Sequence, residues 1–225
     1  MALADWEIIL GGNLTLDTTY KVSGERSLTQ SFNGGSTHIV HKNTYTDAPL
    51  NVEIRTWMTI KLPDYDFYDY IVGGIARKQS DAKTYFYICV IMRFDQNGYY
   101  VTITGSAGYY INGSQTEVVS QDITQDFVDK LGLQWSSGKW RFVRFIGYES
   151  DGKFNMTLEM TPDIDTPDVN NPPLDQLKSI FSASIEIPTE LQNGGACGLV
   201  VGGVKPTGSN ATTANPYYDY TQIYY

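Results

Sequence analysis

The chain contains little cysteine and little histidine. Two of its 225 residues are cysteines and two are histidines. Disulfide-stapled secreted scaffolds and structural zinc sites both need denser sets of these residues. Cys89 and Cys197 each lie in an apolar run, which predicts small buried side chains rather than a disulfide bridge. His38 and His41 stand three positions apart in a predicted strand, so they point to opposite faces and cannot share a metal ion.

Positive charge is also scarce. Lysine and arginine total 16 against 25 acidic residues, which gives a formal net charge of -9. Proteins that bind nucleic acid or anionic membranes need a basic surface, because phosphate groups repel an acidic one. The charge balance therefore predicts neither kind of partner.

Long apolar runs are absent as well. No stretch approaches the roughly 18 residues that a membrane-spanning helix requires. The first residues, MALADWEIIL, lack the basic region of a secretory signal peptide and reach Asp5 and Glu7 early. We therefore expect synthesis in a host cytoplasm without an export signal.

What the chain does contain is tyrosine, glycine and runs of Thr, Val and Ile, a composition that favours β-strands. There are 17 tyrosines and 21 glycines. Clusters of Gly, Asn, Asp and Pro divide the chain at intervals typical of hairpins and loops. The predicted strands cover residues 6–10, 27–32, 37–42, 50–60, 69–78, 84–94, 99–105, 138–149, 153–160, 182–187, 197–205 and 217–225.

Two segments have helical rather than strand periodicity. Apolar residues recur every three or four positions in residues 120–132, before Gly132, and in residues 172–181, after a proline start. We expect both to be short helices in loops. A dozen strands with two helical insertions predict an all-β fold in one domain over residues 1–225. The favoured fold is a two-sheet antiparallel jelly-roll sandwich, with a closed barrel as the alternative.

Four stretches of the sequence resemble the concanavalin A-like (laminin G-like, or lectin/glucanase) jelly-roll superfamily. They are LTLDTTYKVSGERSLTQSF, VGGIARKQSDAKTYFYICVIMRFDQNGYYVTI, SSGKWRFVRFIGYESDGKFNMTLEM, and GACGLVVGG followed by YYDYTQIYY. The matching positions are Gly24, Ser27, Leu28, Gly74, Arg77, Tyr85, Trp140, Gly152, Gly195, Gly198, Leu199 and Asp219. The resemblance spans nearly the whole chain and implies the fold rather than a ligand.

Asp219 is the one residue for which the resemblance implies a site. In related sandwiches the Asp of the closing strand can join a structural calcium site, since Ca²⁺ takes six to eight oxygen ligands. The alternative, which we favour, is that Asp219 accepts hydrogen bonds from a neighbouring turn or arginine. Acidic residues at 163, 165, 168 and 175 also have calcium-like spacing, but they lack the glycine and final glutamate of an EF-hand. No other cofactor is expected.

The residues needed for polysaccharide chemistry are missing. The glucanase branch of the superfamily uses two carboxylates in an E-x-D-x-x-E strand, and this chain has no such motif. Glu186 and Glu190 are the nearest pair, and Pro188 between them disfavours a shared strand face. Two histidines on opposite faces do not supply a lyase-type set either. We expect no enzyme.

Tyrosines in loops and at the end of the chain are the main candidates for contacts. They are Tyr65, Tyr68, Tyr70, Tyr109, Tyr110, Tyr218, Tyr220 and Tyr224. By strand alternation the last three share one face with Gln222. Such rings can pack in the core or at an edge, form a protein interface, or stack on sugars while carboxylates bind the hydroxyl groups.

These observations favour a non-catalytic structural protein of a virion. A capsid decoration, fibre or tail-associated subunit would fit, with homo-oligomers, capsid or tail proteins and a surface glycan as partners. The alternative is a free carbohydrate-binding module or lectin. A polysaccharide-active enzyme is the least favoured hypothesis.

Overall fold

The computed structural model describes residues 3–11, 14–22, 27–30, 35–61, 67–80, 83–95, 97–204 and 216–225. The strands of this part are β1 (Trp6–Leu10), β2 (Leu14–Asp17), β3 (Ser27–Gln30), β4 (Gly35–His41), β5 (Val52–Ile60), β6 (Phe67–Lys78), β7 (Tyr85–Asp95), β8 (Tyr100–Ile111), β9 (Ser114–Asp122), β10 (Trp140–Ser150), β11 (Lys153–Met160), β12 (Lys178–Glu186), β13 (Ala196–Val204) and β14 (Pro216–Tyr224). The helices are α1 (Thr44–Asp47) and α2 (Thr124–Leu131), with 3₁₀ turns at Leu3–Asp5, Leu174–Gln176 and Thr189–Leu191.

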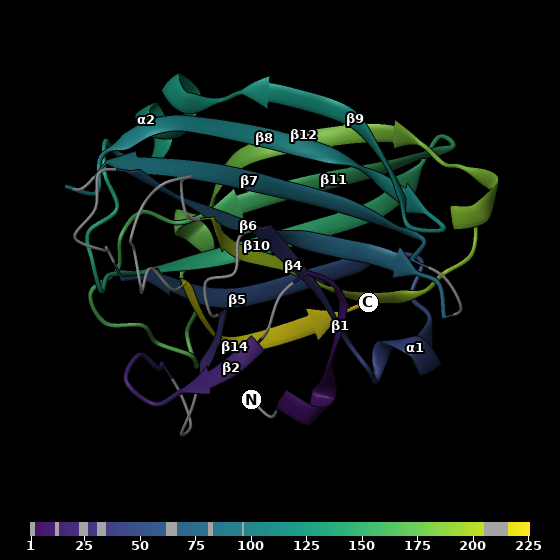
Figure 1. Ribbon diagram of the computed structural model, residues 1–225, viewed down its shortest axis with the longest axis horizontal. Helices are drawn as coiled ribbons and strands as arrows, with labels where there is room; N and C mark the ends of the chain where they lie inside the picture. Colours follow the sequence, from purple (N-terminus) through teal and green to yellow (C-terminus); the bar gives the residue numbers. More distant parts are fainter. Residues whose placement is uncertain are drawn as a thin grey trace.

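The described strands form two antiparallel sheets of seven strands each. Sheet A has the order β1-β4-β13-β6-β7-β8-β9, and sheet B has the order β12-β11-β10-β5-β14-β3-β2. Figure 1 shows sheet A in front, with β6, β7 and β8 crossing over β10 and β11 of sheet B. The two-sheet antiparallel sandwich predicted from the sequence is confirmed.

The core lies between the two sheets and is built by strand alternation. Val52, Ile54, Met58 and Ile60 of β5 are buried on the inner face, as their spacing predicts. Side chains of β7 are buried on both faces, as the uninterrupted apolar run from Phe86 to Met92 predicts for a covered central strand. The sheets approach closely at Gly74, where an added Cβ would lie 2.2 Å from the ring of Phe145.

Two hairpins of the sandwich turn on residue pairs with positive φ. Asn112 (φ 52°) and Gly113 (φ 85°) connect β8 to β9, and Asp151 (φ 54°) and Gly152 (φ 73°) connect β10 to β11. Positive φ at both central residues is the feature of a type I′ turn, whose twist matches that of the two flanking strands. Gly152, one of the positions that match the superfamily, is thus the second turn residue of the β10–β11 hairpin.

One end of the sandwich encloses the side chain of Arg77. This guanidinium donates to the carbonyl oxygens of Leu50 and Leu191, each at 3.0 Å, and to Glu149 Oε2 at 2.7 Å. It also lies over the ring of Phe154, 4.7 Å from the centroid. Hydrogen bonds to every part of the cation offset the cost of removing it from water.

The expected helix over residues 172–181 is wrong. Only Leu174–Gln176 forms a single 3₁₀ turn, and β12 begins at Lys178. Phe181, Ala183 and Ile185 alternate with exposed residues and bury against the core, so sheet pairing with β11 outweighs the short helical pattern. The other expected helix is confirmed as α2, which lies within residues 120–132.

Two strands were not expected, β2 and β9. β9 is almost entirely exposed because it is the edge strand of sheet A, so it lacks a hydrophobic pattern. No helix in the described ranges is long and apolar enough to span a lipid bilayer.

Candidate functional site

The outer face of sheet A carries the polar and aromatic side chains that face away from the core. Along β7 these are Tyr85, Tyr87, Cys89, Ile91 and Arg93, since alternate residues share one face. The residues opposite them on β8 are Tyr110, Gly108, Ser106, Thr104 and Thr102. One face of two adjacent strands therefore changes from aromatic at one end to polar at the other.

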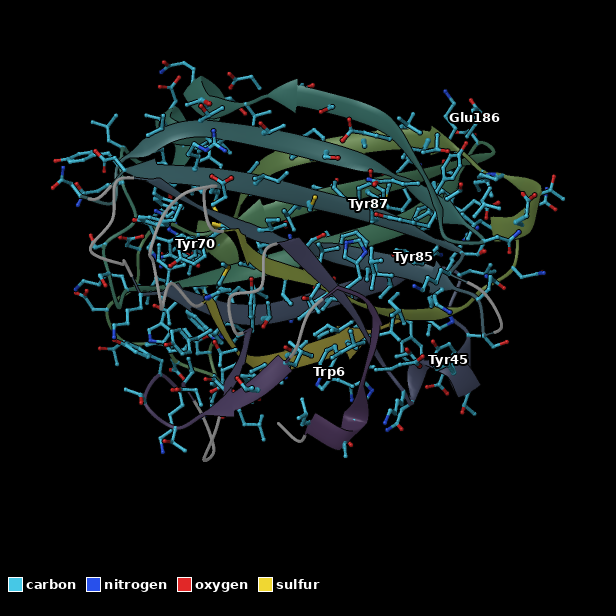
Figure 2. The ribbon with its side chains drawn as sticks, in the orientation of Figure 1. Trp6, Tyr45, Tyr70, Tyr85, Tyr87 and Glu186 are labelled. Atoms are coloured by element: carbon cyan, nitrogen blue, oxygen red, sulfur yellow. The ribbon has the colours of Figure 1, made fainter. Side chains whose placement is uncertain are left out.

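The aromatic end is a packed cluster around His38. Its Nδ1 lies 2.9 Å from the hydroxyl of Tyr85, and its ring lies edge-on to those of Tyr85 and Tyr110. Figure 2 shows Tyr85 and Tyr87 side by side on this face. Burial lowers the pKa of His38 to about 4 and raises the pKa of Tyr110 to about 12. This cluster is a second small core and offers no open site.

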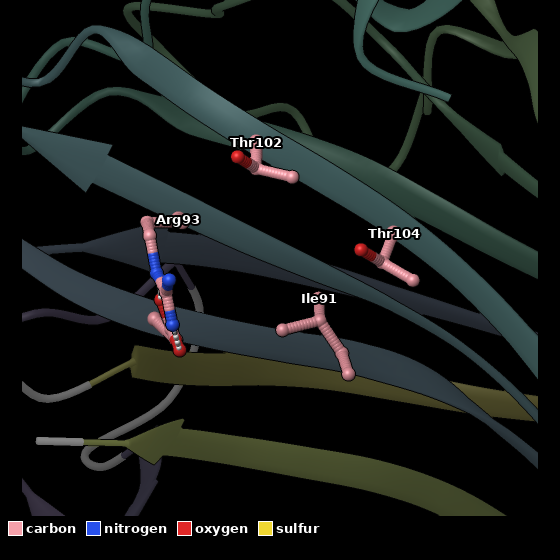
Figure 3. Close-up of a pocket in the computed structure, with 5 residues that line it drawn as sticks. Ile91, Arg93, Thr102 and Thr104 are labelled. Atoms are coloured by element: carbon pink, nitrogen blue, oxygen red, sulfur yellow. Dashed lines mark hydrogen bonds and ion pairs between the residues drawn. The ribbon is translucent and has the colours of Figure 1, made fainter. Parts of the chain in front are cut away.

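The polar end is hollowed. A cavity of about 290 Å³ is lined by Asp69, Ile91, Arg93, Thr102 and Thr104 (Figure 3). Asp69 comes from β6, opposite Arg93 of β7, and the two threonines come from β8. Cross-strand pairing thus brings residues from three consecutive strands around Ile91.

Arg93 and Asp69 form a two-point ion pair at one wall of this hollow. Nε of Arg93 donates to Asp69 Oδ1 at 2.8 Å, and Nη2 donates to Oδ2 at 2.9 Å. The hydrogen bonds to Asp69 raise the pKa of Arg93 above its ordinary value. The Asp69 side chain is 12% exposed and that of Arg93 is 51% exposed, so the pair is anchored on one side and open on the other.

The hydroxyl groups of Thr102 and Thr104 face the same hollow. Neither makes a side-chain hydrogen bond to another described residue, and both side chains are half-buried. A ligand in the hollow can therefore meet two free hydroxyls, a fixed guanidinium and carboxylate, and the apolar side chain of Ile91. Ser106 is the next residue on this face, and its hydroxyl donates to Glu117 at 2.6 Å.

Asp219 is buried and holds two backbone groups. Oδ2 accepts the N–H of Val22 at 2.7 Å, and Oδ1 accepts the N–H of Tyr220 at 2.7 Å. The favoured prediction, an acceptor for a neighbouring turn, is confirmed. Among the described residues no group of three or more His, Cys, Asp or Glu could hold a metal ion.

The loop tyrosines divide between the core and positions outside the described residues. Tyr65 lies outside them. Tyr68 and Tyr70 are buried against Phe94, and Tyr70 donates its hydroxyl hydrogen to the carbonyl of Lys61 at 2.6 Å. Of the roles left open for these two rings, packing in the core is the one that the structure shows, because β6 extends into this segment and alternation turns both rings inward.

Tyr109 and Tyr110 lie on β8, on opposite faces of sheet A. Tyr109 is half-buried against the main core, and Tyr110 packs in the cluster around His38. Packing, one of the three roles left open for these rings, is the role that the structure shows for this pair.

The three C-terminal tyrosines do not share one face. Asp219 pairs with Trp57 but Gln222 pairs with Arg55, so β14 has one residue more than β5 between these positions. Tyr220 has φ 51° and occupies this bulge. Tyr218 therefore points into the core, where its hydroxyl donates to the carbonyl of Ile71 at 2.9 Å. Tyr220 packs on the outer side of sheet B.

Among the predicted tyrosines that the structure describes, Tyr224 is the most exposed. Its ring is 42% exposed and lies 4.5 Å below the guanidinium carbon of Arg55. It remains available for a partner, whereas Tyr218 does not.

The remaining candidates behave as the sequence predicts. Cys89 and Cys197 are free and buried, and burial raises the pKa of each thiol to about 12. His38 joins the outer cluster, while the ring of His41 contacts Trp6 of the main core. Glu186 ends β12 and pairs with Lys153 at 3.3 Å, and Glu190 lies in the following 3₁₀ turn.

The residues around the hollow over Ile91 were missed by sequence reasoning. A signal was present, because alternation along YFYICVIMRFD and YVTIT places Ile91 and Arg93 on one face and Thr102 and Thr104 on another. Joining the two faces requires the register of the β7–β8 hairpin, which contains a bulge between Arg93 and Phe94.

Comparison with known proteins gives likeness of fold only. No family model matches the chain, and no curated protein sequence does. The binding domain of botulinum neurotoxin serotype D is 14% identical with a TM-score of 0.43, over 94% of this chain and 43% of that chain. The present chain thus spans less than half of that domain.

Two further solved structures are similar over most of both chains. A legume lectin-like domain from Entamoeba histolytica is 10% identical with a TM-score of 0.44, over 94% of this chain and 89% of that one. The CBM2 module of the evolved Dit of Lactobacillus casei BL23 phage J-1 is 6% identical with a TM-score of 0.42, over 96% and 79%.

Proposed function

We propose that this chain is a non-catalytic glycan-binding protein and that the hollow over Ile91 binds one sugar unit. The observation that carries the proposal is the set of groups around this hollow. Thr102 and Thr104 present free hydroxyls, and Asp69 holds the guanidinium of Arg93 beside them. Sugar sites combine a few fixed polar groups with an apolar surface, and Ile91 supplies that surface.

The chemistry of a sugar suits these groups. A sugar hydroxyl both donates and accepts hydrogen bonds, so it can donate to a threonine or to Asp69 and accept from Arg93. The Arg93–Asp69 pair is already formed without ligand, which lowers the cost of ordering it on binding. Binding of this kind requires no catalytic pair.

The test is binding of neutral polysaccharides to the whole chain, measured by a glycan array and then by calorimetry. Replacing Thr102 and Thr104 together with Val should weaken binding by about 1 to 3 kcal/mol, since it removes both hydroxyls from a desolvated contact. Thr116→Val is the matched control, because Thr116 is exposed on the neighbouring strand β9 and does not line the hollow. A folded protein that binds no glycan would overturn the proposal.

We further propose that this glycan-binding chain serves as a structural component of a virion. Exposed tyrosines support this setting, because Tyr gives a large contact area at low rotamer cost. Tyr99, Tyr148, Tyr224 and Tyr225 are 42–66% exposed. Mass spectrometry of purified particles tests the proposal, and particles that lack the protein would favour a free carbohydrate-binding module instead.

A further inference from the structure

A second hollow lies where the two sheets open, at the ends of β4 and β14. It has a volume of about 250 Å³ and is lined by His41, Asn43, Thr44, Thr221, Ile223 and Tyr225. His41 ends β4 in sheet A, and Thr221 and Ile223 belong to β14 in sheet B. Pockets for drug-sized ligands begin at about 300 Å³, so this hollow suits a smaller group such as one monosaccharide.

The two threonines of this hollow are already engaged in the fold. The hydroxyl of Thr44 donates to the carbonyl of His41 at 2.6 Å and accepts the N–H of Cys197 at 3.0 Å. The hydroxyl of Thr221 lies 3.0 Å from that of Thr56. They shape the hollow and leave its binding chemistry to other residues.

His41 and Asn43 supply the free polar groups. Neither the imidazole of His41 nor the amide of Asn43 makes a side-chain hydrogen bond within the described part of the chain. The ring of His41 is held edge-on against Trp6, with centroids 5.2 Å apart. An amide and an imidazole each offer a donor and an acceptor, which is the pairing that vicinal sugar hydroxyls need.

Tyr225 supplies an aromatic surface beside these groups. The residue is 66% exposed, and its hydroxyl donates to the carboxylate of Asp47 at the end of α1. This hydrogen bond raises the pKa of Tyr225 and ties the exposed ring to α1. A ring fixed at the mouth of a polar hollow can stack on the apolar face of a pyranose, and the hollow over Ile91 has no such ring.

We propose that this hollow is a second glycan subsite, in which a neutral hexose stacks on Tyr225 and hydrogen-bonds to Asn43 and His41. The carboxylate of Asp47 beside the ring and the net charge of -9 disfavour an acidic sugar. The inference extends the proposed function to a second place on the chain, so a polysaccharide could bind at two points. It depends on glycan binding by this protein but not on the hollow over Ile91.

The experiment is a titration of the full chain with a neutral oligosaccharide, monitored by NMR. The signals of His41 and Asn43 report on this hollow, and those of Thr102 and Thr104 report separately on the hollow over Ile91. Tyr225→Ala should weaken the affinity measured from the His41 and Asn43 signals about tenfold, which is the effect of removing a modest aromatic anchor. Tyr225→Phe keeps the ring and should retain most of the binding. Tyr148→Ala is the control, since Tyr148 is 46% exposed on β10 and lines neither hollow.

The outcomes separate this inference from the proposed function. Glycan responses at Thr102 and Thr104 without any at His41 and Asn43 would overturn the second subsite and leave the first. Responses at His41 and Asn43 that Tyr225→Ala leaves unchanged would also overturn it, because stacking would then play no part. If no oligosaccharide or polysaccharide alters either set of signals, both proposals fail.

Discussion

The carboxylate of Asp219 accepts the backbone N–H of Val22, a residue 197 positions earlier in the chain, at 2.7 Å. The contact ties the segment after β2 to the last strand. The other carboxylate oxygen of Asp219 accepts the N–H of Tyr220 and so supports the positive φ of Tyr220. One buried side chain thus fixes both the closing strand and a loop near the start.

Asp219→Ala should destabilise the fold by about 1 to 3 kcal/mol, because two backbone N–H groups lose their acceptor. Chemical denaturation measures the change. Asp168→Ala is the control, since Asp168 also accepts two backbone N–H groups, from Asn170 and Asn171, but is exposed. An equal loss in both variants would contradict the importance of burial. Added calcium or a chelator should leave the Tm of the wild-type protein unchanged, and a rise with calcium would restore the metal hypothesis.

Arg77→Met should cost about 3 kcal/mol of unfolding free energy, because the carbonyl oxygens of Leu50 and Leu191 lose their donor. Lys153→Met removes an exposed ion pair with Glu186 and should cost less than about 1 kcal/mol. Denaturant titration of both variants checks the difference. A mild effect of Arg77→Met would mean that Phe154 and the apolar surroundings compensate for the lost hydrogen bonds.

Stability should fall as the pH drops from about 6.5 to about 4. Burial lowers the pKa of His38 in the folded state to about 4 from 6.5, so the unfolded chain binds its proton first. The stability from this residue is therefore complete above pH 6.5 and is lost as pH falls through the folded pKa, by about 3 kcal/mol in all. Denaturation of wild type and His38→Gln across this range tests it. Identical pH slopes would contradict the assignment, and Tyr85→Phe, which keeps the histidine, should retain the wild-type slope.

Tyr224→Ser should reduce self-association while leaving the Tm nearly unchanged, because its ring is exposed beside Arg55. Light scattering after gel filtration gives the oligomer size. Tyr218→Ser should instead destabilise the fold by about 3 to 5 kcal/mol through a core cavity. An oligomer that survives Tyr224→Ser unchanged would remove this tyrosine from any interface.

The fold could be predicted from the sequence because most strands show an alternation of apolar and polar residues. The inner face of β5 and the fully covered β7 follow directly from the order of their residues, whereas the burial of Trp57 and Thr59 on the other face of β5 does not. The edge strand β9 was not predicted, because an exposed strand has no apolar face and therefore no alternating pattern. The helix expected over residues 172–181 failed because its apolar residues divide between a 3₁₀ turn and the start of β12, where pairing with β11 outweighs the local helical spacing.

The candidate site was harder to predict because it depends on pairing between strands. Asp69 and Arg93 are 24 positions apart, and only the β6–β7 register places them opposite each other. Tyr68 and Tyr70 were chosen as contact candidates for a related reason. Their segment is acidic and aromatic, which is typical of a loop, but it forms part of a buried strand. The type of a residue indicates which interactions its side chain can make. The pairing register of the strands determines which side chains lie next to it.

The bulge at Tyr220 decides which residues at the end of the last strand face the core. With two residues opposite Thr56, Ile223 reaches the interior and Tyr224 reaches the surface. Regular pairing of the same residues without the bulge would exchange these two positions, placing a tyrosine hydroxyl in the core and an isoleucine in water. The extra residue opposite Thr56 is therefore what gives the end of this strand its buried and exposed sides.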